Sequence, residues 1–143
     1  MATIFVYYSA PSEVEDGKLL CFKTVESYKA GGGKDAQSAE RVKSEYYLCL
    51  LDYEKGEVRE LAKILNDKPY SLEDGVIYYE KDEGKILFAL SEPEGTWQLN
   101  VDGSALEKIS EEKMVPAGVI CSEGRYVYLP PPYFTNDISR LNP

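Results

Sequence analysis

The sequence repeats one pattern of short strand-like segments, and this repeat constrains the fold more than any other feature. Residues 4–8 are followed by a turn at Gly17 and an apolar segment, and the same order returns at residues 76–79 and Gly84. Each copy then continues with a second apolar segment and a short last segment. A period of roughly 40 to 50 residues that holds four strands is typical of propeller blades and related arrays. We therefore expect an all-β protein of antiparallel four-stranded meanders.

The copies divide a single all-β domain into two propeller-like units and part of a third. Unit one covers residues 1–66 and carries an insertion at residues 26–44, whereas unit two covers residues 67–112. A partial third unit covers residues 113–143, with a third copy of the pattern opening at Gly124. Two units and a fraction are too few to close a propeller.

Turn residues mark where each strand is expected to end. Pro11 and Ser12 end the first strand, and the glycines at 31–33 predict a loop within the insertion. Residues 35–43 have the composition of two marginal helical turns. The predicted strands are residues 3–9, 18–25, 45–53 and 58–64 in unit one, and residues 75–80, 85–90, 96–101 and 106–110 in unit two.

A resemblance to a known family is carried by residues 96–109. This segment has a tryptophan, an alternating strand, an Asn-Val-Asp-Gly-Ser turn and a short last strand. It resembles the blade signature of TolB-like β-propellers, best over residues 75–110. Unit one departs from the signature, because a longer turn at residues 52–57 replaces Asp-Gly-Ser. The resemblance implies a scaffold for protein contacts or a domain appended to a hydrolase.

The charge and hydropathy of the chain exclude several kinds of partner. The net charge is −9, so nucleic acid and anionic membrane surfaces would be repelled over most of the surface. No apolar run approaches the roughly 18 residues of a membrane helix. No basic residue precedes Lys18, so a secretory signal is not predicted, and we expect a cytoplasmic protein.

The absence of histidine is the strongest sequence observation about chemistry. It removes the commonest general base, the commonest metal ligand and every Ser-His or Cys-His pair. We therefore expect neither an enzyme nor a bound cofactor or metal. The remaining acidic clusters fall in predicted turns, where solvated carboxylates are usual: Glu13, Glu15 and Asp16; Glu80, Asp82 and Glu83; Glu92 and Glu94; Glu111 and Glu112.

Three further patterns have ordinary structural interpretations. The alternating oxygens of residues 100–104 are similar to a calcium loop but supply too few ligands, and an Asx turn explains them. The glycines before Lys34 lack the spacing of a phosphate loop and are typical of a linker. The cysteines lie among apolar strand residues without close spacing, which favours buried reduced thiols: Cys21, Cys49 and Cys121.

The C-terminal region is the best candidate for a binding surface. A stiff polyproline stretch between aromatic residues either docks on a partner or packs across the sheet edge of the chain itself. The expected contact residues are Tyr126, Tyr128, Pro131, Tyr133 and Phe134.

The function expected from these observations is a non-enzymatic interaction or structural module. Its partner would be another protein or a second copy in a homo-oligomer. Two alternatives stay open: a propeller fragment associated with a hydrolase whose catalytic residues lie elsewhere, and a carbohydrate-binding module that uses Trp97 and surface tyrosines.

Overall fold

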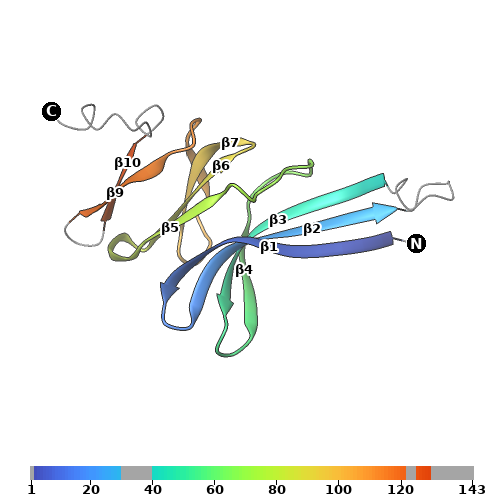
Figure 1. Ribbon diagram of the computed structural model, residues 1–143, viewed down its shortest axis with the longest axis horizontal. Coiled ribbons are helices and arrows are strands. Elements are labelled where there is room, and N and C mark those ends of the chain that lie inside the picture. Colours follow the sequence, from blue (N-terminus) through green and yellow to red (C-terminus); the bar gives the residue numbers. More distant parts are fainter. Residues whose placement is uncertain (1, 30–39, 122–124, 130–143) are drawn as a thin grey trace. The chain divides into compact units, whose positions relative to one another are not determined.

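The computed structural model describes residues 2–29, 40–121 and 125–129, and side chains from residue 3 to residue 114 within these ranges. The chain divides into two compact units, residues 1–73 and residues 74–143. Each unit contains one antiparallel four-stranded sheet with its strands in chain order (Figure 1). The described residues contain no α-helix. The prediction of an all-β protein built from four-stranded meanders is confirmed.

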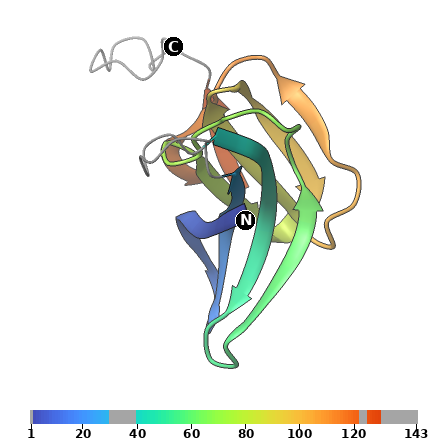
Figure 2. The same ribbon diagram turned by 90° about the vertical axis from the view of Figure 1, so that its right-hand side faces the viewer.

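The first sheet has the order β1-β2-β3-β4, with each strand antiparallel to the next. Its strands are β1 (Ala2–Glu15), β2 (Lys18–Lys29), β3 (Glu40–Asp52) and β4 (Glu57–Lys63). The pairing of β4 with β3 covers only residues 47–52 of β3. The first three strands therefore extend beyond β4, toward the right of Figure 1, and we call this extension the arm (residues 2–8, 24–29 and 40–46). Figure 2 shows β3 curving along its length from the arm to the β3–β4 turn.

The two tight turns of this sheet depend on glycine. Gly17 and Gly56 have φ angles of +80° and +68°. Residues other than glycine rarely adopt this left-handed backbone conformation. The first turn is tied to the second, because the backbone N–H of Tyr53 donates to the Gly17 carbonyl at 2.9 Å. These local signals place both hairpins where the sequence predicts them.

Two predictions about the first sheet are wrong. The first strand does not end at Pro11 and Ser12, because β1 continues to Glu15 through a register shift between Ser9 and Ser12. An edge strand tolerates proline at such a bulge, since the missing N–H need not join the ladder. The insertion is also shorter than predicted, because residues 26–29 and 40–44 belong to β2 and β3. Residues 30–39 lie outside the described part of the chain, as does most of the predicted helical stretch.

The core of the first unit lies along β2 and β3. Register places Phe22 opposite Leu48 and Thr24 opposite Tyr46, and each of these side chains is at most 1% exposed. Cys49 is buried on the other face of β3. The apolar run in β3 therefore reflects burial on both faces at the centre of the strand.

The second sheet has the order β5-β6-β7-β8. Its elements are β5 (Val76–Glu80), the 3-10 turn η2 (Lys81–Glu83), β6 (Lys85–Ser91), β7 (Glu94–Asn100) and β8 (Glu107–Ser110). Five consecutive residues of β6, from Ile86 to Leu90, are buried, which makes β6 the central core strand. All four predicted strands of unit two are present.

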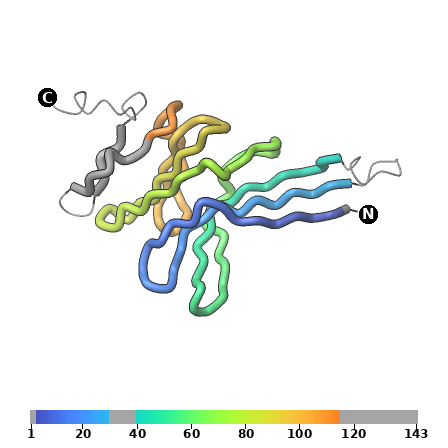
Figure 3. The backbone as a smooth tube through the Cα atoms, viewed as in Figure 1, coloured from blue at the N-terminus to red at the C-terminus, as the bar shows by residue number. Residues whose placement is uncertain are grey.

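The two sheets repeat the order of elements but not the position of each residue. The first hairpin closes with Glu15 opposite Lys18, and the fifth strand closes with Glu80 opposite Lys85. Figure 3 traces the backbone of both meanders. Tyr79 directly precedes Glu80, whereas Tyr8 is separated from Glu15 by the register shift in β1. The matching tyrosine pairs therefore occupy different parts of their strands.

A two-stranded antiparallel pair follows the second sheet. It consists of β9 (Val115–Cys121) and β10 (Arg125–Leu129). The strand that opens the third copy in the sequence is thus formed, and within the described residues it pairs with the strand before it. No helix in the described part of the chain has the length and apolar character to cross a bilayer.

Candidate interaction surface

The contact residues expected from the sequence lie at the limit of the described chain. Tyr126 and Tyr128 belong to β10, where they pair with Ile120 and Pro116 of β9. The orientation of their side chains is outside the described part, as are Pro131, Tyr133 and Phe134. Their contact with a partner stays a prediction.

The structure shows a different apolar surface, on β1. Five consecutive side chains of this strand are 40% to 61% exposed, although all five are large and apolar or aromatic: Ile4, Phe5, Val6, Tyr7 and Tyr8. Because successive side chains of a strand point to opposite faces, the exposed residues lie on both faces of the arm. Sequence reasoning identified this strand but missed its exposure, since the pattern does not show which strand lies at the edge.

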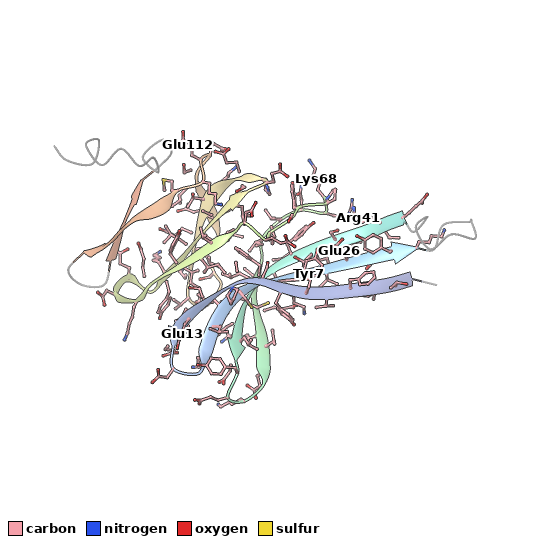
Figure 4. All side chains as sticks on the ribbon, viewed as in Figure 1. Tyr7, Glu13, Glu26, Arg41, Lys68 and Glu112 are labelled. Atoms are coloured by element: carbon pink, nitrogen blue, oxygen red, sulfur yellow. The ribbon has the colours of Figure 1, made fainter. Side chains whose placement is uncertain are left out.

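One face of the arm is ordered by Glu26 of β2. The hydroxyl groups of Tyr7 and Tyr28 both donate hydrogen bonds to its carboxylate, and the rings of Phe5 and Tyr28 meet edge to face at 5.6 Å. Figure 4 shows Tyr7 and Glu26 on neighbouring strands. Partial burial and the hydrogen bond to Glu26 raise the pKa of Tyr7 well above its usual value. These contacts hold the aromatic side chains in place while leaving part of each ring exposed.

The opposite face of the sheet carries polar contacts next to the arm. Lys23 forms an ion pair with Glu60 at 3.0 Å and lies 5.8 Å from the ring centre of Tyr47. The Tyr47 hydroxyl donates to Glu45, and this hydrogen bond raises the pKa of Tyr47 to about 12. The same bond, with nearby lysines, lowers the pKa of Glu45. On this face, Ile4, Val6 and Tyr8 of β1 are exposed opposite Ser27, Val25 and Lys23 of β2.

The edge of β3 in the arm is closed by the segment that follows β4. Asp67 accepts the backbone N–H of Ser44 at 2.8 Å and pairs with the Arg41 guanidinium at 2.6 Å. These two partners lower the pKa of Asp67. Arg41 also donates to the Ser44 hydroxyl at 3.2 Å. Polar contacts thus satisfy the backbone N–H of Ser44 on this edge.

Tyr46 anchors the same segment to the sheet. Its ring is 1% exposed and lies 5.6 Å from the ring of Tyr70. Its hydroxyl accepts the backbone N–H of Tyr70 at 2.7 Å and donates to the carbonyl of Lys68. One buried hydroxyl therefore fixes residues 68–70.

The turn between β7 and β8 is the predicted Asx turn. The backbone N–H of Ser104 donates to Asp102 Oδ1 at 2.9 Å, and the Asn100 amide donates to the Ser104 hydroxyl at 3.0 Å. Lys85 donates to Asn100 Oδ1 at 2.9 Å, which places a cation where a calcium ligand would be needed. These oxygens are used within the protein, so the arrangement does not favour a calcium loop.

Trp97 is a core residue of the second unit. It is 8% exposed, stacks on Phe88 at 5.2 Å with an interplanar angle of 7°, and has Lys108 Nζ 5.1 Å from its ring centre. A sugar-binding tryptophan presents an open ring face. This geometry therefore does not favour the carbohydrate-binding alternative.

The cysteines expected to be buried are placed by the register of the first sheet. Cys21 on β2 lies directly opposite Cys49 on β3, both are free thiols, and both are at most 3% exposed. Burial raises the pKa of both thiols, and that of Cys49 reaches about 12. The side chain of Cys121 is outside the described part. Neither thiol described is suited to nucleophilic chemistry at neutral pH.

The described residues contain no group of three or more Cys, Asp or Glu side chains arranged to hold a metal ion. Comparisons of the chain with family models, curated proteins and solved structures give no match.

Proposed function

We propose that the chain is a non-enzymatic interaction or structural module that binds a protein partner by adding a strand to the outer edge of β1. The observation that carries the proposal is the run of exposed apolar side chains at residues 4–8 on an edge strand. A partner strand would pair with the backbone of β1, and its side chains would cover the neighbouring apolar residues. Strand addition of this kind takes its affinity from backbone hydrogen bonds and its specificity from alternate side chains.

The propeller-like character of the two meanders is part of the same proposal. Two consecutive four-stranded sheets in up-and-down order support it, as does the strand pair that follows them. A blade depends on its neighbours to cover its faces, so a chain with few blades needs a partner. The expected contact at residues 126–134 would serve this need at the other end of the chain.

A catalytic function has less support in the geometry. The acidic clusters singled out in the sequence lie in turns or at strand ends beside them, as for Glu13 near the first hairpin and Glu112 after β8 (Figure 4). The expectation that they are solvated is wrong for Glu80, which is buried at the end of β5. We expect that replacing Asp82 or Glu111 with alanine changes the unfolding free energy by no more than about 0.5 kcal/mol. A hydrolase or transferase turnover that such a substitution abolishes would contradict the non-enzymatic proposal.

Binding of a model strand tests the proposal directly. The probe is a fluorescent peptide with the sequence of residues 3–9, flanked by glutamines for solubility. We expect its anisotropy to rise on titration with the folded protein. A control peptide with proline in place of the central valine should not bind, because proline lacks the N–H that a ladder requires.

The protein variant Val6→Lys places a charge in the middle of the edge and should weaken binding of the unmodified peptide at least tenfold. A matched control is Val58→Lys, because Val58 is similarly exposed but lies on β4, at the opposite edge of the same sheet. The proposal fails if the peptide does not bind, or if the proline peptide binds equally well.

A further inference from the structure

The structure points to the identity of the strand that completes the first sheet. This inference deepens the proposed function and rests on it, because it requires that the edge of β1 accept a strand. We propose that the occupant is β1 of a second copy of the chain, paired antiparallel with the first. The result would be a continuous eight-stranded sheet across a two-fold axis.

The outer half of β1 is a regular edge. Among the strands that the structure describes it pairs with β2 alone, and its register runs without interruption from Ala2 opposite Lys29 to Ser9 opposite Phe22. Devices that protect edge strands, such as proline, bulges and charged side chains, are absent from residues 2–8. Pro11 and the register shift come only after Ser9. Seven consecutive residues are thus available to pair with another strand.

The other edges of the same sheet are protected. β4 carries Glu57, Arg59, Glu60 and Lys63 among its seven residues. The part of β3 that extends beyond β4 carries alternating charges, and Asp67 occupies the N–H of Ser44 on this edge. Charges are therefore present on both of these edges and missing from residues 2–8 of β1. This contrast marks the edge of β1 as the one built to accept a strand.

The charge distribution selects a second copy as the occupant. The whole chain has a net charge of −9, yet its first twelve residues carry no charged side chain. A basic peptide paired along residues 2–8 would find no carboxylate on this part of β1 to pair with its cations. An uncharged, β-branched and aromatic strand with a regular edge is the complementary partner, and β1 itself has these properties. Two copies would meet where their mutual repulsion is weakest.

Two-fold symmetry and the exposed side chains of β1 both favour a second copy as the occupant. An antiparallel pair of identical strands is related by a two-fold axis, so the same patch serves both copies and the assembly closes at a dimer. Exposed apolar side chains lie on both faces of β1, and pairing would place each set beside its own copy across the axis. A single strand pair buries a small interface, so we expect a dissociation constant on the order of micromolar.

Sedimentation of the full chain tests the inference. We expect wild-type protein to form a concentration-dependent species of twice the 16.1 kDa chain mass. Val6→Lys should raise the dissociation constant at least tenfold, because a symmetric pair would bring two copies of the new charge together. Ile4→Lys, at the 61% exposed position on the same face, should act in the same direction. The matched control Val58→Lys should leave the dimer unchanged.

Salt dependence separates self-association from binding of a basic partner. Two copies with a charge of −9 repel each other, so raising NaCl from about 0.05 to about 0.5 M should strengthen the dimer. A salt-bridged complex with a basic protein would weaken under the same change. Hydrogen exchange on the unmodified chain gives a second measurement. Backbone amides of residues 3–8 should become more protected as the protein concentration rises, and those of β4 should not.

The outcomes distinguish this inference from the proposed function. A wild-type chain that stays monomeric at high concentration while binding the strand peptide overturns self-pairing and leaves strand addition in place. A dimer that Val6→Lys and Val58→Lys weaken equally, or whose β1 amides gain no protection, also overturns self-pairing. Failure of the peptide to bind is the result that removes the proposed function itself.

Discussion

The Arg41 guanidinium and the Asp67 carboxylate lie 2.6 Å apart and join the arm to the segment after β4. The same carboxylate oxygen accepts the backbone N–H of Ser44. One aspartate therefore neutralises a cation and satisfies the edge of β3 at a point where β4 no longer pairs with it.

Replacing Asp67 with alanine should lower the stability of the first unit at neutral pH, because Ser44 N–H loses its acceptor and Arg41 its partner. Asp67→Asn keeps an oxygen acceptor but not the charge, so it should have a smaller effect. Because the folded pKa of Asp67 is lowered from 3.8, its stabilising effect is present above that value. The effect is lost as the pH falls through the lower folded pKa.

Urea unfolding of wild type and Asp67→Asn at neutral pH and at about pH 2 measures this difference. The stability gap between the two proteins should be larger at neutral pH. An equal gap at both pH values would show that the carboxylate charge contributes nothing.

Removing the Tyr46 hydroxyl should cost about 1–3 kcal/mol of unfolding free energy, because two backbone groups at residues 68 and 70 lose a buried partner. Tyr53→Phe is the matched control. The Tyr53 hydroxyl also accepts a backbone N–H, from Gly17 at 3.1 Å, but the side chain is 51% exposed, so water can replace it. Chemical denaturation should show a clearly larger loss for Tyr46→Phe. Equal losses would contradict the anchoring role of Tyr46.

Cys21 and Cys49 should react with a thiol reagent only when the first sheet opens. Burial excludes the reagent and raises both thiol pKa values, so little thiolate is present at neutral pH. In a Cys121→Ser background, native protein should label at least about 100-fold more slowly than urea-unfolded protein. Both thiols should label together, since they face each other across β2 and β3. Rapid labelling of either one in native protein would be inconsistent with the packing.

Gly95→Ala should destabilise the second unit by about 1–3 kcal/mol. An added Cβ would lie 2.4 Å from Lys108 Cε and 3.1 Å from both the Ser110 carbonyl oxygen and the Trp97 ring. Gly84→Ala is the control, because Gly84 has a φ of +63° but no atom within 4 Å of an added Cβ. Gly84→Ala should therefore lower the unfolding free energy only by the strain of alanine in a left-handed backbone conformation, about 1 kcal/mol. Tryptophan fluorescence should change for Gly95→Ala alone, and an unchanged spectrum would argue against the clash.

The parts of the fold that depend on local chemistry could be predicted from the amino-acid sequence. The strand predicted at residues 85–90 is observed as Lys85–Ser91. The predicted Asx turn forms through a hydrogen bond between Asp102 and Ser104, two residues apart. Turn glycines, alternating side chains and Asx hydrogen bonds act over a few residues, so their pattern is visible without knowledge of the partners. The order of both four-stranded meanders followed from these local signals.

Features that depend on pairing with another strand became visible only in the folded protein. Pairing with β2 carries β1 past Pro11, and mutual pairing draws residues 26–29 and 40–44 out of the predicted insertion. The register between β2 and β3 sets Cys21 opposite Cys49, residues far apart in the chain. Whether Val6 is covered or exposed depends on which strand lies beside it. Hydrogen bonding between strands is not a local property, and for this reason the exposed edge of β1 could be found only in the folded sheet.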